Sequence, residues 1–186
     1  MTQVYLARHG QTAYNHERRF QGRLPVPLDA TGRAQAAALA EEASAHGFVA
    51  LWSSTLLRAF ETAEIVARRL ALPIREDDRL VETDAGDWTD LPFADVAAAE
   101  PEAVAAFVRG DPTFAFPGGE SFATQAARVA AALADVEAGA LPALVVCHGQ
   151  VIRLALAERS PGGVERALPE SAHVGNGALV PLPELG

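Results

Sequence analysis

The sequence predicts an α/β fold, a three-layer α/β/α sandwich around a mostly parallel central sheet. Short apolar runs at residues 4–7, 48–52 and 144–147 have the length of buried strands. Longer segments with apolar residues at helical spacing, such as residues 56–70, lie between them. This alternation of strands and helices is typical of a parallel sheet covered by helices on both faces.

The expected elements follow in order along the chain. The strands are residues 4–7, 48–52, 72–75 at an edge, 144–147, and a last strand or hairpin over 174–182 with a turn at Asn176 and Gly177. The helices are residues 33–46 capped by Thr31 and Gly47, 56–70, 93–109 with a break near Pro101, a helix from Ser121 to about Gly139, and one starting at 150–156 that is broken at 160–163. Residues 13–28 and 111–119 are expected to be loops. We find no repeat and no linker, so we expect a single domain over residues 1–186.

The helix over residues 56–70 raises a question about its first turn. The hydroxyl groups of residues 53–55 could cap it, and its buried face is expected to contain Leu57, Phe60, Ile65, Val66 and Leu70. Arg58 falls in the first turn, where a cation opposes the helix dipole. Either an anion held at the helix N-terminus or simple surface exposure would account for this arginine.

Composition limits the classes of partner. The chain is 49% hydrophobic and 21% charged, as in ordinary globular proteins with a real core. Its net charge of −9 argues against nucleic acid or an anionic membrane as the main partner. We find no segment long enough to span a bilayer and no signal peptide, because Arg8, His9 and Gly10 interrupt the first apolar stretch. The single cysteine, Cys147, cannot form an internal disulfide, so we expect a cytoplasmic protein.

Two of the predicted strands end in the same way. Arg8, His9 and Gly10 follow the first strand, and His148 and Gly149 follow residues 144–147. Open α/β sheets bind ligands at the carboxyl ends of their strands, so we expect the two histidines to converge above one sheet. The permanent charge of Arg8 and the close approach that glycine permits suit a phosphate group. Taken singly, each histidine could equally be a loop residue with a satisfied ring.

Other candidate residues lie in loops. Asn15 and Gln21 can donate amide hydrogens to an anion, and Gly22 lets the backbone come close to it, although a solvated connection explains this loop equally well. Glu82 follows two apolar residues into a loop, but residue chemistry alone does not distinguish it among twenty-four acidic residues. Cys147 could be a nucleophile, and its apolar neighbours favour a buried, inert thiol instead. No spacing typical of metal ligands occurs, so neither a metal nor a cofactor is expected.

Together these motifs resemble the histidine phosphatase superfamily, in its phosphoglycerate-mutase-like branch. The resemblance extends over nearly the whole chain. Five features match in order: Arg8 to Thr12 with Asn15; Arg19 through Gln21 and Gly22 to Leu28 and Gly32; Ser53 through Arg58 to Thr62 and Ala63; Leu80 and Glu82 with Gly86 and Trp88; and Gly118 to Ser121 followed by His148 and Gly149.

The resemblance implies a metal-independent phosphatase that acts on a small-molecule phosphate ester. His9 would accept the phosphoryl group as a transient phosphohistidine, and Glu82 would be the proton donor. The transferring oxygens would be bound by Arg8, Arg58, His148, Asn15 and the Gly149 amide, with Gln21 and Gly22 also at the site. His9 must attack as neutral imidazole, and the two neighbouring arginines are expected to lower its pKa.

Two features depart from the family pattern and bear on the substrate. Residues 24–26 are Leu-Pro-Val where similar members commonly carry an acid, and Thr89 and Asp90 follow Trp88 where members have Glu-Gly. The segment between Trp88 and Gly118 is shorter than in the glycolytic mutases, which favours a phosphatase over a phosphoglycerate mutase. A catalytically inactive binding protein of the same fold is a third interpretation. The identity of the substrate and the oligomeric state, monomer or homodimer, stay open.

Overall fold

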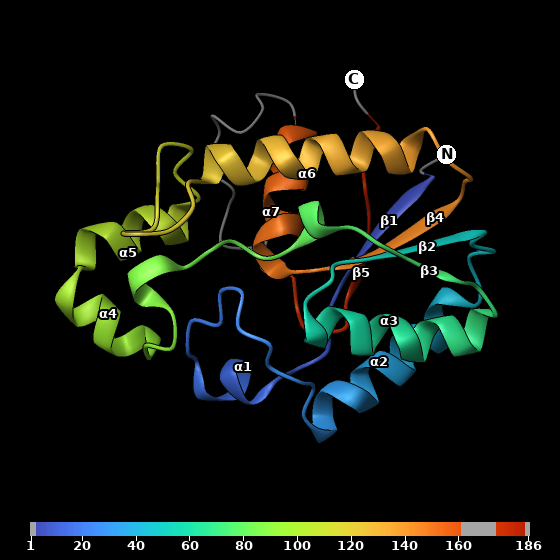
Figure 1. Ribbon diagram of the computed structural model, residues 1–186, viewed down its shortest axis with the longest axis horizontal. Coiled ribbons are helices and arrows are strands. Elements are labelled where there is room, and N and C mark those ends of the chain that lie inside the picture. The colour runs from blue at the N-terminus through green and yellow to red at the C-terminus, as the bar shows by residue number, and fades with distance from the viewer. Residues whose placement is uncertain (1–2, 161–173, 185–186) are drawn as a thin grey trace.

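The central sheet contains five strands, four of them parallel (Figure 1). The computed structural model describes residues 3–160 and 174–184. The strands are β1 (Val4–Arg8), β2 (Ala50–Ser53), β3 (Ile74–Glu76), β4 (Ala143–Cys147) and β5 (Leu179–Pro181), in the order β3-β2-β4-β1-β5. Only β5 is antiparallel, against β1. The predicted mostly parallel sheet, with residues 74–76 as an edge strand, is therefore confirmed.

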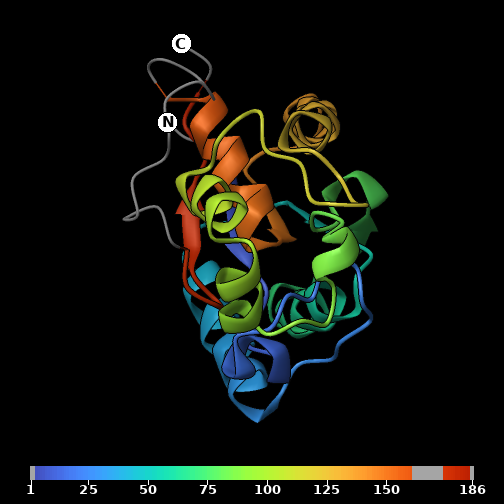
Figure 2. The ribbon, with the colours of Figure 1, turned by 90° about the vertical axis from the view of Figure 1, so that its left-hand side faces the viewer.

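Helices cover both faces of this sheet. On one face lie α2 (Ala30–Ala43) and α3 (Leu57–Leu70), and on the other α6 (Phe122–Glu137) and α7 (Gly149–Glu158), as the two perpendicular views show (Figures 1 and 2). The short helices α1 (Ala13–Glu17), α4 (Phe93–Ala99) and α5 (Pro101–Arg109) lie at one end of the molecule. This is the predicted α/β/α sandwich. Within the residues that the structure describes, no helix is long and apolar enough to cross a bilayer.

Strand β4 is buried along its whole length because helices pack on both of its faces. Its side chains alternate between two cores, as the strand period of two requires. Val145 and Cys147 pack in the core beneath α6 and α7, whereas Leu144 and Val146 pack in the core beneath α2 and α3. The carboxyl end of this rigid central strand is where His148 begins.

A third core, made largely of aromatic side chains, stands beside the sheet. It attaches α4, α5 and the loop at 110–121 to the start of α6. Trp88 and Phe122 are fully buried in it, and Phe20 and Phe107 are partly buried. Ring centroids within this core lie 5.0 to 6.3 Å apart, which is the usual range for favourable aromatic pairs. The helix break at Pro101 and the loop at 111–119 occur as predicted.

Helix α2 begins and ends earlier than expected. Its N-cap is Asp29, whose carboxylate accepts a hydrogen bond from the Gly32 amide at 2.7 Å, so the prediction that Thr31 caps the helix was wrong. Asp and Thr are both good N-caps, and sequence alone did not separate them. The helix ends at Ala43, and Gly47 lies in the following turn with φ of 66°.

The buried face of α3 also differs from the prediction. Its buried residues are Arg58, Ala59, Thr62, Ala63 and Val66. Leu57, by contrast, is 37% exposed. The helix turns two polar side chains inward because they belong to the site described below, and its alanines allow close packing against α2. Its N-cap is Leu56, whose own side chain makes no capping hydrogen bond. Of the three hydroxyls predicted to cap the helix, Ser54 Oγ accepts from the amide of this N-cap residue at 3.2 Å.

Two further differences concern chain segments near the site. The predicted loop at 13–28 contains the one-and-a-half-turn helix α1, which a capping box between Thr12 and Asn15 stabilises. The turn at Asn176 and Gly177 is confirmed, and of the two predicted alternatives, a last strand or a hairpin, the described residues form the single strand β5, which is shorter than predicted. Helix α7 ends at Glu158, and most of the predicted helix break at 160–163 lies outside the described residues.

Candidate functional site

The two histidines meet at the carboxyl ends of neighbouring strands. His9 follows β1 and His148 follows β4, and their ring centroids lie 5.2 Å apart. Their exposed fractions are 2% and 0%. The His9 amide donates to the carbonyl of Cys147 at 3.0 Å, which continues the strand pairing up to the two rings. The expected convergence of the two histidines is confirmed.

The His9 ring is held in one tautomer. Its Nδ1 lies 2.6 Å from the Gly10 carbonyl oxygen, so we assign the proton to Nδ1 and the lone pair to Nε2. The Nε2 atom accepts a hydrogen bond from Arg58 Nε at 3.2 Å. Burial first, and then the charges of Arg58 and Arg8, lower the pKa of His9 well below 6.5. The ring is therefore neutral at physiological pH, as predicted, although burial contributes more than the arginines.

Arg58 is a buried residue of the site and not a surface residue of α3. It is 1% exposed, and its guanidinium donates to the carbonyls of Gly22 at 2.9 Å and Leu24 at 3.1 Å. Burial lowers its pKa to about 10, so the side chain is still charged at neutral pH. Gly22 has φ of 49°, which favours glycine and presents its carbonyl to the guanidinium.

Arg8 and His148 each place an unsatisfied polar atom at the site. Arg8 Nη1 donates to the Val174 carbonyl at 2.6 Å, but its Nε is buried without a partner among the described residues. Ser54 Oγ accepts from the Leu56 amide and lies 2.8 Å from His148 Nε2. We assign the Ser54 hydroxyl hydrogen to Nε2, which places the hydrogen of the neutral His148 ring on Nδ1, a buried atom without a partner among the described residues. Buried donors without an acceptor cost about 1–3 kcal/mol each. An anion bound beside the two histidines would supply those acceptors.

Glu82 lies across the site from the histidines. Its Oε1 accepts from the Thr83 amide at 2.9 Å and from Gln125 Nε2 at 3.3 Å. Its Oε2 accepts from the Gln150 amide at 3.3 Å, in the first turn of α7, where the helix dipole favours a carboxylate. These partners come from a loop and from helices α6 and α7, so no local sequence signal could have selected this acid.

Asn15 and Gln21 both turn their amide oxygens toward the protein. Asn15 Oδ1 accepts from the Thr12 amide at 3.1 Å and from Asn176 Nδ2 at 3.2 Å. Gln21 Oε1 accepts from the Thr12 hydroxyl at 2.9 Å. Because the oxygens are used as acceptors, the amide nitrogens are the groups that can donate to an anion, as the sequence suggested.

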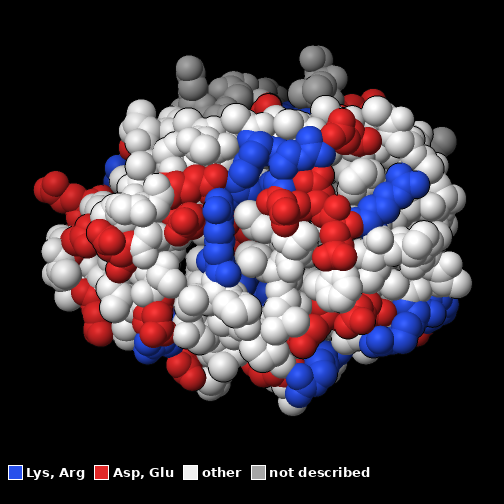
Figure 3. All heavy atoms as spheres, viewed as in Figure 1, with Lys and Arg blue, Asp and Glu red and all other residues white. Residues whose placement is uncertain are grey.

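Of the site residues described above, all but the fully buried His148 line a cavity of about 190 Å³. Its lining comprises Arg8, His9, Asn15, Arg19, Phe20, Gln21, Gly22, Arg58, Glu82, Thr83, Ala85, Phe107, Phe116 and Gln150. A second cavity of about 290 Å³ shares five of these residues and adds Tyr14, Arg18 and Phe93. Both cavities have walls from residues 18–27 and from residues 90–119. On the face in Figure 3, basic side chains form narrow stripes bordered by acidic ones and no broad patch.

The sequence did not indicate a polar cluster at the cavity mouth. Arg19 Nη2 and the Tyr14 hydroxyl each donate to Asp90 Oδ1 at 2.8 Å. Asp90 has φ of 67°, the left-handed region that favours glycine, and it stands where similar family members carry glycine. The aspartate in place of this glycine was the feature of the sequence that could have indicated the cluster.

The cysteine next to His148 is buried. Burial raises the pKa of the Cys147 thiol, which agrees with the interpretation of an inert cysteine.

The fold and the site define an α/β protein with two buried histidines and two arginines at the carboxyl ends of neighbouring strands. A model of the histidine phosphatase superfamily (branch 1) matches residues 4–182, and the chain belongs to this superfamily. Over 159 residues the chain is 40% identical to a glucosyl-3-phosphoglycerate phosphatase of Mycobacterium tuberculosis, covering 80% of this chain and 71% of that protein. It is also 40% identical over 152 residues to a probable phosphoglycerate mutase of Salmonella paratyphi B, covering 80% of this chain and 70% of that protein.

The fold is shared with a solved relative. The structure of a mycobacterial glucosyl-3-phosphoglycerate phosphatase in complex with VO3 superposes with a TM-score of 0.85 and 36% sequence identity. The superposition covers 96% of this chain and 90% of that one. Family membership, predicted from five ordered motifs, is therefore confirmed.

Proposed function

We propose that this phosphatase hydrolyses small phosphate monoesters through a phosphohistidine on His9. The observation that carries the proposal is the pairing of two buried histidine rings, 5.2 Å apart, with the guanidinium of Arg58 on His9 Nε2. Phosphoryl transfer spreads negative charge over the transferring oxygens, so catalysis is mainly positioning and electrostatic stabilisation. Arg8, Arg58 and His148 can supply this stabilisation without a metal ion.

The reaction has two steps. In the first, His9 Nε2 attacks phosphorus, the P–N bond forms, and the ester P–O bond breaks as Glu82 gives its proton to the departing oxygen. In the second, the Glu82 carboxylate takes a proton from water, the water oxygen attacks phosphorus, and the P–N bond breaks to release inorganic phosphate. General acid and base catalysis of this kind contributes about 10² to 10⁴ in rate.

The two adjoining cavities suggest how a substrate would lie. The phosphate group would occupy the inner cavity beside the histidines, and the leaving group would extend into the outer cavity. Phe93 and Phe107 give that cavity apolar surface, while Arg18 and Arg19 add positive charge. We therefore propose substrates whose leaving group has both an apolar or ring surface and an acidic group. Phosphorylated glycerates and their sugar conjugates, the class named for the mycobacterial relative, belong first in a substrate panel.

The central test is His9→Ala, with His16→Ala as the control. His16 is an exposed histidine on α1. We expect His9→Ala to abolish both turnover and the acid-labile phosphoenzyme seen by mass spectrometry after rapid quenching, because Nε2 is the attacking atom. His16→Ala should retain both. Release of phosphate by His9→Ala at the wild-type rate would refute the proposal.

A phosphoglycerate mutase is the second candidate, favoured by the similarity to the Salmonella protein. Incubation with 3-phosphoglycerate separates the two, because a mutase exchanges the isomers and a phosphatase releases phosphate. An inactive binding protein would do neither.

Metal independence and compartment complete the proposal. Among the described residues, no group of three histidine, cysteine or acidic side chains is placed to hold a metal ion. We expect activity to be unchanged in EDTA, and loss of activity that Mg²⁺ or Zn²⁺ restores would contradict this. We also propose a cytoplasmic location, because the one cysteine is a buried thiol.

A further inference from the structure

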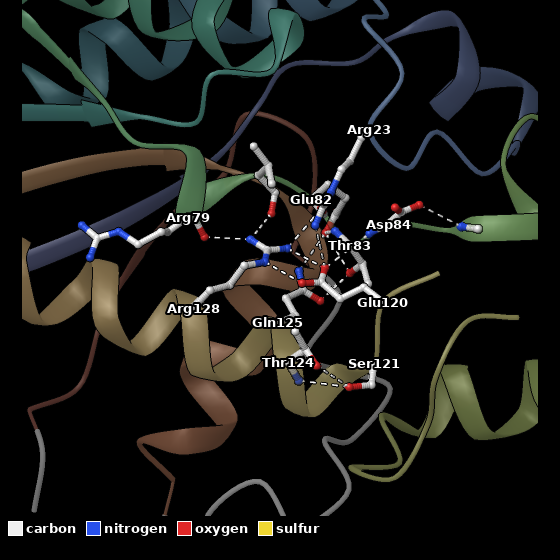
Figure 4. A network of polar contacts seen from close by, with 12 residues as sticks. Arg23, Arg79, Glu82, Thr83, Asp84, Glu120, Ser121, Thr124, Gln125 and Arg128 are labelled. Atoms are coloured by element: carbon white, nitrogen blue, oxygen red, sulfur yellow. Dashed lines mark hydrogen bonds and ion pairs between the residues drawn. The ribbon is translucent and has the colours of Figure 1, made fainter. Parts of the chain in front are cut away.

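We propose that helix α6 positions Glu82 for proton transfer through two side chains one helical turn apart, Gln125 and Arg128 (Figure 4). The proposal rests on the proposed function, in which Glu82 is the proton donor. Neither side chain lines the reaction cavity, so both are positioning residues and not catalytic ones. Arg128 fixes the backbone around Glu82, and Gln125 fixes its carboxylate.

Arg128 uses all five of its donor hydrogens. Its Nη1 donates to the carbonyls of Arg79 at 2.7 Å and Val81 at 2.6 Å, and its Nη2 donates to the carbonyl of Glu82 at 3.2 Å. The remaining donors bind both carboxylate oxygens of Glu120 at 2.8 Å. A guanidinium has five donors in a fixed fork, whereas a lysine ammonium has three. Arg128 therefore holds the backbone at three points between Arg79 and Glu82, the proton donor.

Glu120 anchors this guanidinium and connects it to a second segment. Its carboxylate, 7% exposed, also accepts from Arg23 Nη2 at 3.2 Å and from the Asp84 amide at 3.4 Å. Arg23 Nε in turn lies 3.4 Å from the Glu82 carbonyl oxygen. The backbone after Glu82 is thus bound to the Glu120 carboxylate directly, and the backbone up to Glu82 is bound to it through Arg128.

Gln125 acts on the carboxylate itself. Its side chain is fully buried, its Nε2 donates to Glu82 Oε1 at 3.3 Å, and its Oε1 accepts from the Thr83 hydroxyl. The Thr83 amide donates to the same Glu82 oxygen at 2.9 Å. With Oε1 held by these two donors, Oε2, which accepts only from the Gln150 amide among the described residues, is the oxygen with room to carry the transferable proton toward the leaving group. Displacing a reacting group by about 1 Å can cost about 10²-fold in rate.

The test compares two substrates that differ in their need for a proton. The alcohol leaving group of benzyl phosphate must be protonated as it departs, whereas the phenolate of 4-nitrophenyl phosphate leaves without a proton. The value of kcat/KM reports the steps up to release of this group. We expect Arg128→Met and Gln125→Met to lower kcat/KM for benzyl phosphate by about 10- to 100-fold. For 4-nitrophenyl phosphate we expect a loss of less than about threefold, because phosphate binding and His9 are unchanged.

Two reference variants accompany these. Glu82→Gln removes the proton donor and defines the full selectivity between the two substrates. Arg69→Met removes an arginine of α3 that binds Glu41 on α2 and Ser44 at the end of α2. This variant should leave both kcat/KM values unchanged. Circular dichroism melting checks that each variant folds. If Arg128→Met does not fold, Arg128→Lys, which keeps the charge but not the five donors, and Gln125→Met carry the test.

The outcomes separate the two proposals. Selective loss with Glu82→Gln and with the α6 variants supports positioning by α6. Selective loss with Glu82→Gln but equal loss of both substrates in the α6 variants overturns it, because these residues would then only support the fold. If Glu82→Gln itself shows no selectivity, Glu82 is not the proton donor, and both the proposed role and this inference fail.

Discussion

At the scale of single residues, Gly10 shows how tightly the loop after β1 is packed. A Cβ on Gly10 would lie 2.2 Å from the Gly32 carbonyl oxygen, a backbone atom that cannot move aside. We expect Gly10→Ala to lower the free energy of unfolding by at least about 2 kcal/mol in urea titrations. Gly175→Ala is the matched control, because no atom of the described residues lies within 4 Å of the added Cβ. Equal stability of the two variants would show that the loop can shift.

Cys147 gives a second prediction at this scale. The thiol is fully buried and burial raises its pKa, so neither the thiolate nor access for a reagent is available in the folded protein. We expect iodoacetamide to leave the native protein unmodified and to add one group per chain in urea, as measured by intact mass. Rapid alkylation of the native protein, with loss of activity, would restore the reactive-cysteine interpretation.

The site residues divide into those that sequence could predict and those it could not. His9 and His148 were predictable because a strand end in a parallel sheet has a known place in the fold. Glu82 was not, since its place depends on Gln125 and Gln150, which are 43 and 68 residues further along the chain. The resemblance to a family supplied what local chemistry lacked.

At the scale of elements, the C-terminal end of α3 has a strained backbone conformation. Ala71 ends α3 with φ of 54°, a left-handed conformation that costs about 1 kcal/mol without glycine. We expect Ala71→Gly to raise the free energy of unfolding by about 0.5 kcal/mol, after the entropy of the extra glycine is counted. Ala138→Gly is the control, because Ala138 ends α6 with φ of −75° and gains nothing from glycine. It should lose stability, and a gain in both variants would contradict the conformational argument.

The boundaries of elements were predicted less well than their existence. All five strands and the main helices lie close to the expected residues, because apolar period and length are encoded locally. The predicted buried face of α3 was right at Val66, Ile65 and Leu70 but wrong at Leu57, and it omitted two polar side chains. The prediction counted only apolar residues, whereas Arg58 and Thr62 are buried by the site. Thr62 Oγ accepts from the Gly10 amide at 3.1 Å, a contact across 52 residues that no periodicity reveals.

At the scale of the whole molecule, three cores meet around the site. The two sheet cores hold the histidine strands, and the aromatic core supplies Phe107 and Phe116 to the cavity wall. Predicting the sheet cores required only the strand pattern. The aromatic core joins Phe20 to residues 88–122, and these distant segments share no periodicity. The shape of the substrate that the cavity accepts therefore depends on the aromatic core, the part of the fold that was hardest to predict from the sequence.

Burying two neutral histidines makes the stability of the whole molecule depend on pH. Burial, followed by nearby arginine charges, lowers the pKa values of His9 and His148 well below 6.5. Below about pH 6.5 the unfolded chain binds protons on both rings and the folded protein does not, so the free energy of unfolding falls as pH falls. The loss continues until the much lower pH at which the folded rings protonate. Each histidine contributes up to about 1.4 kcal/mol per pH unit.

Urea titrations at pH 7.5, 6.5 and 5.5 measure this slope directly. We expect the wild-type protein to lose stability between pH 6.5 and 5.5, and the double variant His9→Gln, His148→Gln to lose much less, because glutamine does not titrate. The exposed control His16→Gln should keep the wild-type slope. A double variant as steep as the wild type would mean that other groups cause the acid sensitivity. In that case the burial of neutral His9, which lets the ring act as a nucleophile at neutral pH, would not lower the free energy of unfolding in acid. That result would contradict the linkage between protonation and folding.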